Sequence, residues 1–600
     1  MQSETSTSRP DKGAARALWL CLLCLFLIRA ITALVPSMWA WGLNVLRFMT
    51  PLAAWLPWTL GAMFLLRALG ARGERFLAEF SDRLLKARLA PWLVALAAGG
   101  IVWSLPDRTW LTGDFLLRQG LAERGAFAGN LSHSLPLEVL LNFTIPRAFE
   151  SFSHLDPNVA NRLIGAIAAA ALGLCSLALA REWGFTESAA GVAAGTIWFG
   201  GYLTVFTGLG KPAAMLCVLT AMSVLGATRL VDSMRGGWLI GASVGSAFVT
   251  HRSGLALAPL WIACVVLAAR KHQLLGWRSR MELGTAAGLP IIGGIIALPM
   301  VWRIFFDFDL PRHFLTASVR KAGFVSTAFA PMHLIDLANL LLLYTPAIVS
   351  ASIVVIADRR DSLRGLSALL LVILLLSFAP LLLFIHPIQG VFRDLEVFAP
   401  AGLASALLAA FVLGRGLQER RLASWLSPVL IASVLVPSLQ WLLQFHDPVR
   451  GLRRARMFAI EMPARAPDEL AQLWDLLAYR AFRLQEWSLA VEASEQSVRY
   501  APNERAKLML AVARTYVGKF GAAETVYVEL ADRFPADPLV WVGLCGVAFR
   551  LGDSLQVQRS LPKVRAFLAQ PQGARLIQKH LSVFPQVWPS REQLPQGAAP

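Results

Sequence analysis

Charge is what this 600-residue sequence most clearly lacks. Only 16% of its residues are charged, whereas 56% are hydrophobic, and the mean hydropathy is +0.56. Soluble domains are about 25% charged and about 45–50% apolar. A soluble enzyme, a disordered chain and a fibrous repeat are therefore excluded for the chain as a whole, and the composition is that of a multi-pass membrane protein.

Cysteine is also scarce, and several catalytic motifs are missing. Of the six cysteines, only Cys545 lies outside an apolar segment. Cys21 and Cys24 form a CxxC on a hydrophobic helix, where packed thiols are favoured over a redox or zinc pair. The sequence has no GxxxxGK[ST] loop, GxSxG elbow or HExxH, and no GxGxxG after a strand, which disfavours nucleotide-driven transport and serine hydrolysis.

Apolar segments of about 20 residues recur between residues 15 and 444 and predict about thirteen membrane-spanning helices, one of them over residues 332–357. The 56 basic residues exceed the 38 acidic ones, and they concentrate in alternate loops, above all in 67–88. Because basic residues favour the cytoplasmic side, the N-terminus is expected inside and the C-terminus outside. Membrane orientation thus explains the net charge of +18 without a nucleic-acid partner.

Three parts follow from this pattern. Residues 1–88 hold an N-terminal tail, two spans and a basic cytoplasmic loop, and residues 89–445 hold the main membrane domain with the long external loop 106–161. Residues 446–600 are expected to form an extracytoplasmic helical domain, in which Trp474 and Trp541 lie 67 residues apart, about twice the period of tetratricopeptide repeats. The predicted fold is all-α: a polytopic membrane bundle of about 13 spans followed by an α-solenoid. Such a solenoid favours a concave surface for a protein or glycan partner, with a rigid cap on the membrane domain as the alternative.

Ionisable residues gather at the predicted external mouths of the spans. Asp114 follows Gly113 in loop 106–161, a position where partial burial turns a carboxylate into a general base; a solvated or capping aspartate is the alternative. Charges at span mouths usually face a cavity. This predicts substrate-binding roles for His133, Glu138, Lys211, His251, Arg252, Arg393, Asp394 and Glu396. A structural Arg393–Asp394 ion pair and snorkelling of Lys211 and Arg252 to lipid headgroups stay open. The DxD of Asp307 and Asp309 leaves a divalent cation open, and no other cofactor is indicated.

The order of these features resembles the GT-C glycosyltransferases, multi-span enzymes that use polyprenyl-phosphate sugars. The string GD-x-L-x-R and a later S-x-P-L-E are met by Gly113, Asp114, Leu116, Arg118, Ser134, Pro136, Leu137 and Glu138. A late RDWD-F pattern is met by RDLEVF, in which Leu395 and Glu396 replace Trp and Asp, and Lys211 stands where the family has a glutamate.

The resemblance implies an inverting sugar transfer to an extracytoplasmic glycan, lipid or protein. Asp114 would be the base, and Arg393, Arg252 or Lys211 would stabilise the leaving polyprenyl phosphate. It also implies a bacterial inner membrane as the location. An O-antigen ligase or polymerase-like protein and a membrane-anchored scaffold for envelope assembly are the competing interpretations. The scaffold is disfavoured because a mere anchor has no need of so many charges at span mouths.

Overall fold

The computed structural model describes residues 12–113, 133–153, 157–272, 276–358 and 361–588. Within these ranges the chain is helical and contains no β-strand, which confirms the all-α prediction for them. The chain divides into two compact units, Met1–Gly451 and Leu452–Pro600, called here the membrane unit and the C-terminal unit. Each is described by itself.

The membrane unit is built from long apolar helices joined by short helical turns. Its α-helices are α1 (Lys12–Leu34), α2 (Pro51–Met63), α3 (Arg67–Lys86), α4 (Ala90–Ser104), α7 (Pro136–Val139), α8 (Ile145–Ser153), α9 (Pro157–Glu182), α10 (Glu187–Trp198), α11 (Ala213–Ser233), α12 (Gly237–Thr250), α13 (Ala258–His272), α14 (Trp277–Ile304), α15 (Ala317–Ala322), α16 (Phe324–Ala328), α17 (Pro331–Tyr344), α18 (Ala347–Ala357), α19 (Leu366–Phe384), α20 (Ala399–Gln418) and α21 (Ser427–His446). The turns are η1 (Asn44–Phe48), η3 (Leu140–Thr144), η4 (Gly201–Phe206), η5 (Arg252–Leu257), η6 (Phe305–Phe314), η7 (Asp361–Leu363), η8 (Leu395–Phe398) and η9 (Ser424–Leu426), of which η3 and η6 are π-helical.

Eight helices among the described residues are long and apolar enough to cross a membrane, or up to ten if each of two bent helix pairs is one span. The helices α4 and α12 are apolar but shorter. Apolar side chains on α4 and α14 face outward, among them Leu96 and Ile295. Exposed apolar helix faces of this kind fit a lipid environment, so a multi-pass membrane protein is the architecture that the fold supports.

Helix α20 lies at the centre of the unit and packs against α10, α18 and α19. Nearly all of its side chains are buried, because its sequence is apolar on every face. Small residues let neighbours approach closely: a Cβ on Gly402 would lie 2.6 Å from the ring of Tyr344. Buried on all sides, α20 fixes the position of the loops at both of its ends.

The expected single span over 332–357 is broken. Helices α17 and α18 meet at Thr345 and Pro346 with a bend of 96°. Proline has no backbone N–H and restricts the residue before it, so the helix stops there although the hydrophobic run continues. A similar bend of 92° separates α2 from the amphipathic α3.

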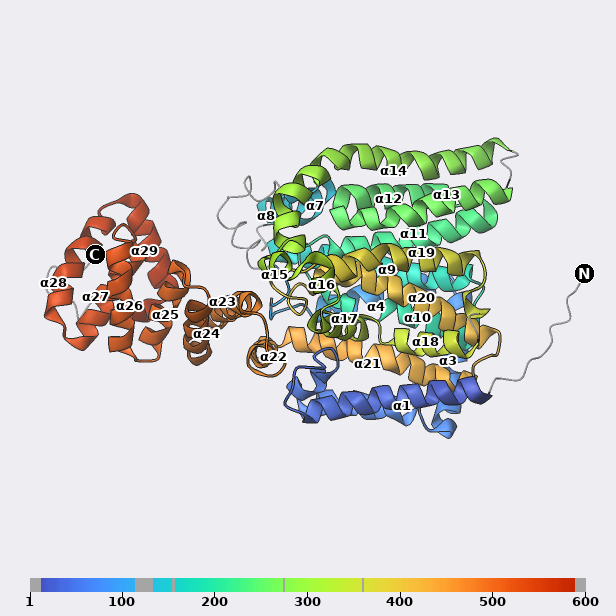
Figure 1. Ribbon diagram of the computed structural model, residues 1–600, viewed down its shortest axis with the longest axis horizontal. Helices are drawn as coiled ribbons and strands as arrows, with labels where there is room; N and C mark the ends of the chain where they lie inside the picture. Colours follow the sequence, from blue (N-terminus) through green and yellow to red (C-terminus); the bar gives the residue numbers. More distant parts are fainter. Residues whose placement is uncertain (1–11, 114–132, 154–156, 273–275, 359–360, 589–600) are drawn as a thin grey trace, which may run out of the picture. The chain divides into compact units, whose positions relative to one another are not determined.

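The connecting segments meet in two groups, which we name the Gly113 end and the Arg421 end; helices such as α9, α11, α20 and α21 run between them (Figure 1). At the Gly113 end, contacts join residues 105–113, 207–212, 251–257, 303–316, 385–398 and 443–447. At the Arg421 end, contacts join residues 84–86, 181–187, 229–237, 271–272, 276–282, 358, 361–364 and 415–426.

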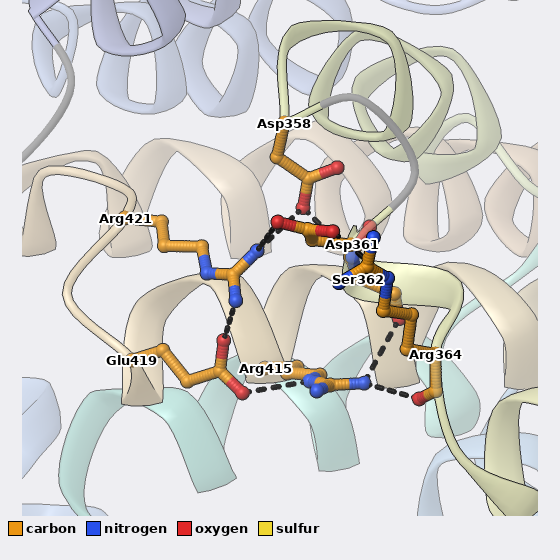
Figure 2. A network of polar contacts seen from close by, with 7 residues as sticks. All are labelled: Asp358, Asp361, Ser362, Arg364, Arg415, Glu419 and Arg421. Carbon is orange, nitrogen blue, oxygen red and sulfur yellow. Dashed lines mark hydrogen bonds and ion pairs between the residues drawn. The ribbon is translucent and has the colours of Figure 1, made fainter.

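Figure 2 shows a dense ion-pair network at the Arg421 end. The guanidinium of Arg421 contacts Glu419 at 2.7 Å and Asp358 at 3.3 Å, while Arg415 contacts the same Glu419 at 2.7 Å. Ser362 N donates to Asp358 at 2.9 Å. The network ties the α18–α19 connection to the end of α20, and its charges satisfy one another.

The C-terminal unit is a row of antiparallel helices. They are α22 (Pro448–Ile460), which crosses the boundary between the units, α23 (Pro467–Arg483), α24 (Trp487–Tyr500), α25 (Glu504–Tyr516), α26 (Phe520–Arg533), α27 (Pro538–Leu551), α28 (Ser554–Leu568) and α29 (Pro571–Val583), followed by the 3₁₀ turn η10 (Pro585–Val587). Each helix from α23 to α28 packs on the next. Helices α24, α26 and α28 begin at Trp487, Phe520 and Ser554, a recurrence of 33 and 34 residues.

Candidate functional site

Gly113, the last residue described before position 133, lies against two other segments at the Gly113 end. Its backbone N–H donates to the carbonyl oxygen of Arg393 at 3.0 Å. Its φ of +61° lies in the left-handed region that favours glycine. A Cβ at this position would collide with the carboxylate of Glu396 and would lie 2.5 Å from Nζ of Lys211. Only glycine fits here, because it leaves room for both charged groups.

Lys211 and Glu396 form a buried ion pair across 185 residues of sequence. Their side chains are only 10% and 4% exposed. Lys211 is held by a tight turn between η4 and α11 that uses the positive φ of Gly208 and Gly210, and Glu396 stands in η8 at the start of α20. A buried charge needs a partner. The lysine and the glutamate, both departures from the GT-C pattern, supply each other with one.

Arg393 and Asp394 are buried beside this pair, at 7% and 5% exposure, in the loop that runs from α19 to η8. Tyr344 donates from its hydroxyl to the carbonyl of Leu395 at 2.5 Å, and Phe392 packs edge-on against Trp41 at 5.4 Å. Packing on both sides therefore fixes the backbone of this loop, and with it the Arg393 carbonyl that holds Gly113.

A small pocket of about 20 Å³, enough for about one water molecule, lies beside Lys211. Its polar lining comes from Lys211, Asn161 and Asn142, and its apolar lining from Ile164 and Met215, with neighbouring residues of α9 and α11. Oδ1 of Asn161 is buried without a hydrogen-bond partner. Its lining combines a cation and two amides with an apolar floor, and a space of this size suits a single small polar group such as a water molecule.

A second cluster centres on Phe308 in η6. The imidazole of His133 stacks on its ring at 4.3 Å, and the guanidinium of Arg312 lies over it at 4.5 Å. Arg252 approaches the ring at 5.9 Å and forms an ion pair with the buried Asp309. The π-helical turn of η6 places Asp309 inside and Asp307 outside, so the DxD carboxylates do not converge.

The Phe308 cluster is rich in positive charge. Burial, together with the guanidiniums of Arg312, Arg252 and Arg303, lowers the pKa of His133, which keeps this imidazole neutral at pH 7. Asp307 opposes this effect weakly. Three arginines that act on one imidazole create a local potential that attracts anions.

The remaining predicted residues are placed as follows. His251 forms a hydrogen bond from Nδ1 with Oγ of Ser253 at 2.8 Å and caps η5, directly before Arg252. Glu138 is 1% exposed on α7, which packs against α12. Asp114, the predicted base, lies outside the described residues.

No family model matches this chain. Comparison with curated proteins and with solved structures gave no match either. We therefore infer the function from the chain's own geometry.

Among the residues that the structure describes, no three His, Cys, Asp or Glu side chains gather into a group that would hold a metal ion. Two histidines, His333 and His386, do lie side by side, with their rings 4.3 Å apart. Burial, and secondarily His333, lowers the pKa of His386 to about 4. His386 N donates a hydrogen bond to the carbonyl of His313 at 2.7 Å, which links this pair to the end of η6, the turn that carries Phe308.

Sequence reasoning missed Phe308 and Asn161. Phe308 lies within an aromatic run, FFDFD, in which nothing distinguishes the ring that carries three polar neighbours from the other two. Asn161 lies in the first turns of α9 and has no motif around it. Both are recognisable only once segments far apart in the sequence are brought together.

Proposed function

We propose that the chain is an integral membrane glycosyltransferase of the GT-C type, which moves a sugar from a polyprenyl-phosphate donor to an extracytoplasmic acceptor. The observation that carries the proposal is the meeting of Gly113, Lys211, Arg393 and Glu396, from three distant segments, beside a cavity at one end of the bundle. Gly113 and Arg393 match the GT-C pattern, whereas Lys211 and Glu396 depart from it.

The proposal includes a membrane domain of thirteen spans. From residue 84 onward the connections alternate strictly between the Arg421 end and the Gly113 end, through α4, α9, α10, α11, α12, α13, α14, α17 with α18, α19, α20 and α21. With α1 and α2, these helices would make the thirteen crossings of the proposal, whereas length and hydropathy alone qualify eight of the described helices, or ten with each bent pair taken as one span. The basic loop 67–88 belongs to the Arg421 end, which supports a cytoplasmic Arg421 end, an external Gly113 end and an external C-terminal unit in a bacterial inner membrane.

The chemical step would be a direct displacement. The acceptor hydroxyl oxygen forms a bond to the anomeric carbon while the bond from that carbon to the phosphate oxygen breaks, and the electron pair leaves with the phosphate. Asp114, next to Gly113, takes the hydroxyl proton. The acidic residue and the leaving phosphate then lie on opposite faces of the sugar, as inversion requires.

The cations divide into two roles. Lys211 is neutralised by Glu396, so its task is to hold Gly113 and the wall of the cavity in place. Arg252 and Arg312 are suited to the polyprenyl phosphate, because a guanidinium carries five N–H donors. Arg252 contacts Asp309 through Nε, so its terminal nitrogens still offer donors to phosphate oxygens. The neutral His133 adds a hydrogen bond without a charge of its own.

The C-terminal unit fits a tetratricopeptide-like solenoid, which would recruit a protein or glycan partner to the external end. The support is its row of helical hairpins with a recurrence of 33 and 34 residues. This part of the proposal does not depend on the catalytic part.

The test is transfer of radiolabelled sugar from polyprenyl-phosphate donors in reconstituted vesicles. Asp114→Asn should lower kcat by at least about 100-fold, the usual contribution of a general base. The matched control is Asp232→Asn, an exposed carboxylate that pairs with Lys271 at the Arg421 end and should leave transfer unchanged. Equal transfer by both variants would exclude Asp114 as the base. No transfer by folded wild type from any donor would favour the scaffold instead.

A further inference from the structure

The first helices of successive hairpins in the C-terminal unit form one continuous face. Helices α23, α25 and α27 contact one another in order, and α29 extends the row beyond α27. In stacked helical repeats such a face is the inner, ligand-binding one. Here the chain itself returns over it: after α29, the turn η10 contacts α25, α27 and α29.

Phe584 is the first anchor of this returning segment. Its ring packs against Phe482 at 4.6 Å and meets Tyr516 and Trp487 edge-on, each at 6.3 Å. Trp487 and Tyr516 are stacked on each other at 3.9 Å. Three aromatic side chains from α23, α24 and α25 thus make a preformed pocket for one further aromatic ring.

Val587 is the second anchor, and its side chain is fully buried. Its carbonyl oxygen lies against Gly546, in the middle of α27, at the place that a Cβ would occupy. Glycine is among the poorest helix formers, so Gly546 lowers the intrinsic stability of α27 at the point where the segment crosses the helix. Between the anchors, Gln586 N donates to the hydroxyl of Tyr516 at 3.4 Å.

The segment has the pattern of a bound peptide. Phe584 and Val587, three residues apart, point into the face, whereas Pro585 and Gln586 between them are exposed. Three contacts hold the segment: the aromatic pocket around Phe584, the close approach of the Val587 carbonyl to Gly546, and the hydrogen bond that the Tyr516 hydroxyl accepts from Gln586 N. These contacts recognise side chains and a short backbone stretch, and they do not require that the segment be covalently part of the unit.

We propose that this face is a docking groove for a polypeptide segment that carries an aromatic residue and, three positions later, an aliphatic one, and that residues 584–588 occupy it as an internal competitor. A partner with that chemistry gains access by displacing the segment. Because the competitor is tethered, it acts at an effective concentration in the millimolar range and sets the threshold that a partner must exceed. The proposal does not rest on the transferase activity.

The test uses the full-length protein in detergent micelles and a fluorescently labelled peptide of the chain's own residues 581–592, LSVFPQVWPSRE. The double variant Phe584→Ala with Val587→Ala removes the internal anchors and leaves the groove intact. Fluorescence anisotropy should show binding to this variant at least about tenfold tighter than to wild type. A peptide in which both anchor residues are alanine should not bind.

A second measurement covers the case in which the double variant unfolds. Gly546→Ala places a methyl group where the Val587 carbonyl lies, and should speed hydrogen exchange at the amides of residues 586–588 by about tenfold or more. Gly521→Ala is the matched control, a helical glycine of α26 with open space around it, and should leave that exchange unchanged. Equal peptide binding by wild type and the folded double variant would overturn the proposal, as would unaltered exchange in Gly546→Ala.

Discussion

The buried Lys211–Glu396 pair allows a quantitative test of how the Gly113 end is held together. Glu396→Gln removes the carboxylate that pairs with the Lys211 ammonium, in a site where the lysine is 10% exposed. Removing one partner of a buried pair costs about 3–5 kcal/mol, and Lys211→Met should cost a similar amount by stranding the carboxylate. The double variant has no stranded charge and should be much less destabilised than the sum of the two single variants.

The expected coupling energy is therefore at least about 2 kcal/mol. It is measured by unfolding in mixed micelles with increasing SDS, followed through the reaction of the buried Cys175 and Cys217 with a thiol dye. The exposed pair Lys271–Asp232, with side chains 42% and 47% exposed, is the matched control and should couple by less than about 1 kcal/mol.

A coupling energy for Lys211 and Glu396 as small as that of the control pair would refute this reasoning. It would mean that water reaches both groups and that the pair does not fix Gly113. If the coupling energy is large but the double variant transfers sugar normally, the pair stabilises the fold and is not needed for sugar transfer.

Three further predictions concern other parts of the chain. In the same SDS assay, Gly113→Ala should be more destabilising than its control Gly184→Ala by at least about 1 kcal/mol. Both glycines have a positive φ, but of the two only Gly113 has other side chains where a Cβ would lie. Gly113→Ala should also abolish sugar transfer. Arg421→Gln should lower the free energy of unfolding by about 1–3 kcal/mol by leaving clustered carboxylates without their common cation, with kcat unchanged in the transfer assay. Burial lowers the pKa of His580 to about 4. Between about pH 6.5 and pH 4 the unfolded chain binds a proton at this histidine and the folded chain does not, so the free energy of unfolding falls as the pH falls, with a limiting slope of about 1.4 kcal/mol per pH unit. The protection of α29 amides from hydrogen exchange should therefore differ less between pH 7 and pH 5 in His580→Gln than in wild type.

Hydropathy predicted the helical character of the described residues, because burial in lipid requires every backbone polar group to be satisfied within a helix. The assignment of the two sides from positive charge stays a prediction. The break between α17 and α18 escaped this reasoning. The run over 332–357 is apolar throughout, so hydropathy is continuous across Thr345 and Pro346 while the backbone is not. The thirteen-span count stays a prediction, supported by the alternation of the two ends.

At the site, sequence reasoning selected Lys211, Arg252, Arg393 and Glu396 as ionisable residues at span mouths, but it did not pair them. The partner of Lys211 lies 185 residues away, and spacing along the chain carries no information about such a contact. Asp309 illustrates the same limit: the DxD pattern left a divalent cation open, and its spacing could not show that Asp309 is buried against Arg252. The role of Asp114 stays a prediction.

The most direct test of the central claim is to locate the donor on the protein. A photoactivatable polyprenyl phosphate is crosslinked to the protein in reconstituted vesicles, and the labelled peptides are mapped by mass spectrometry. The account predicts labels in 207–212, 251–257, 303–316 and 385–398, competed away by unlabelled polyprenyl phosphate and lost in Arg252→Gln with Arg312→Gln. Specific labels at the Arg421 end, or labels that the unlabelled lipid does not displace, would contradict it.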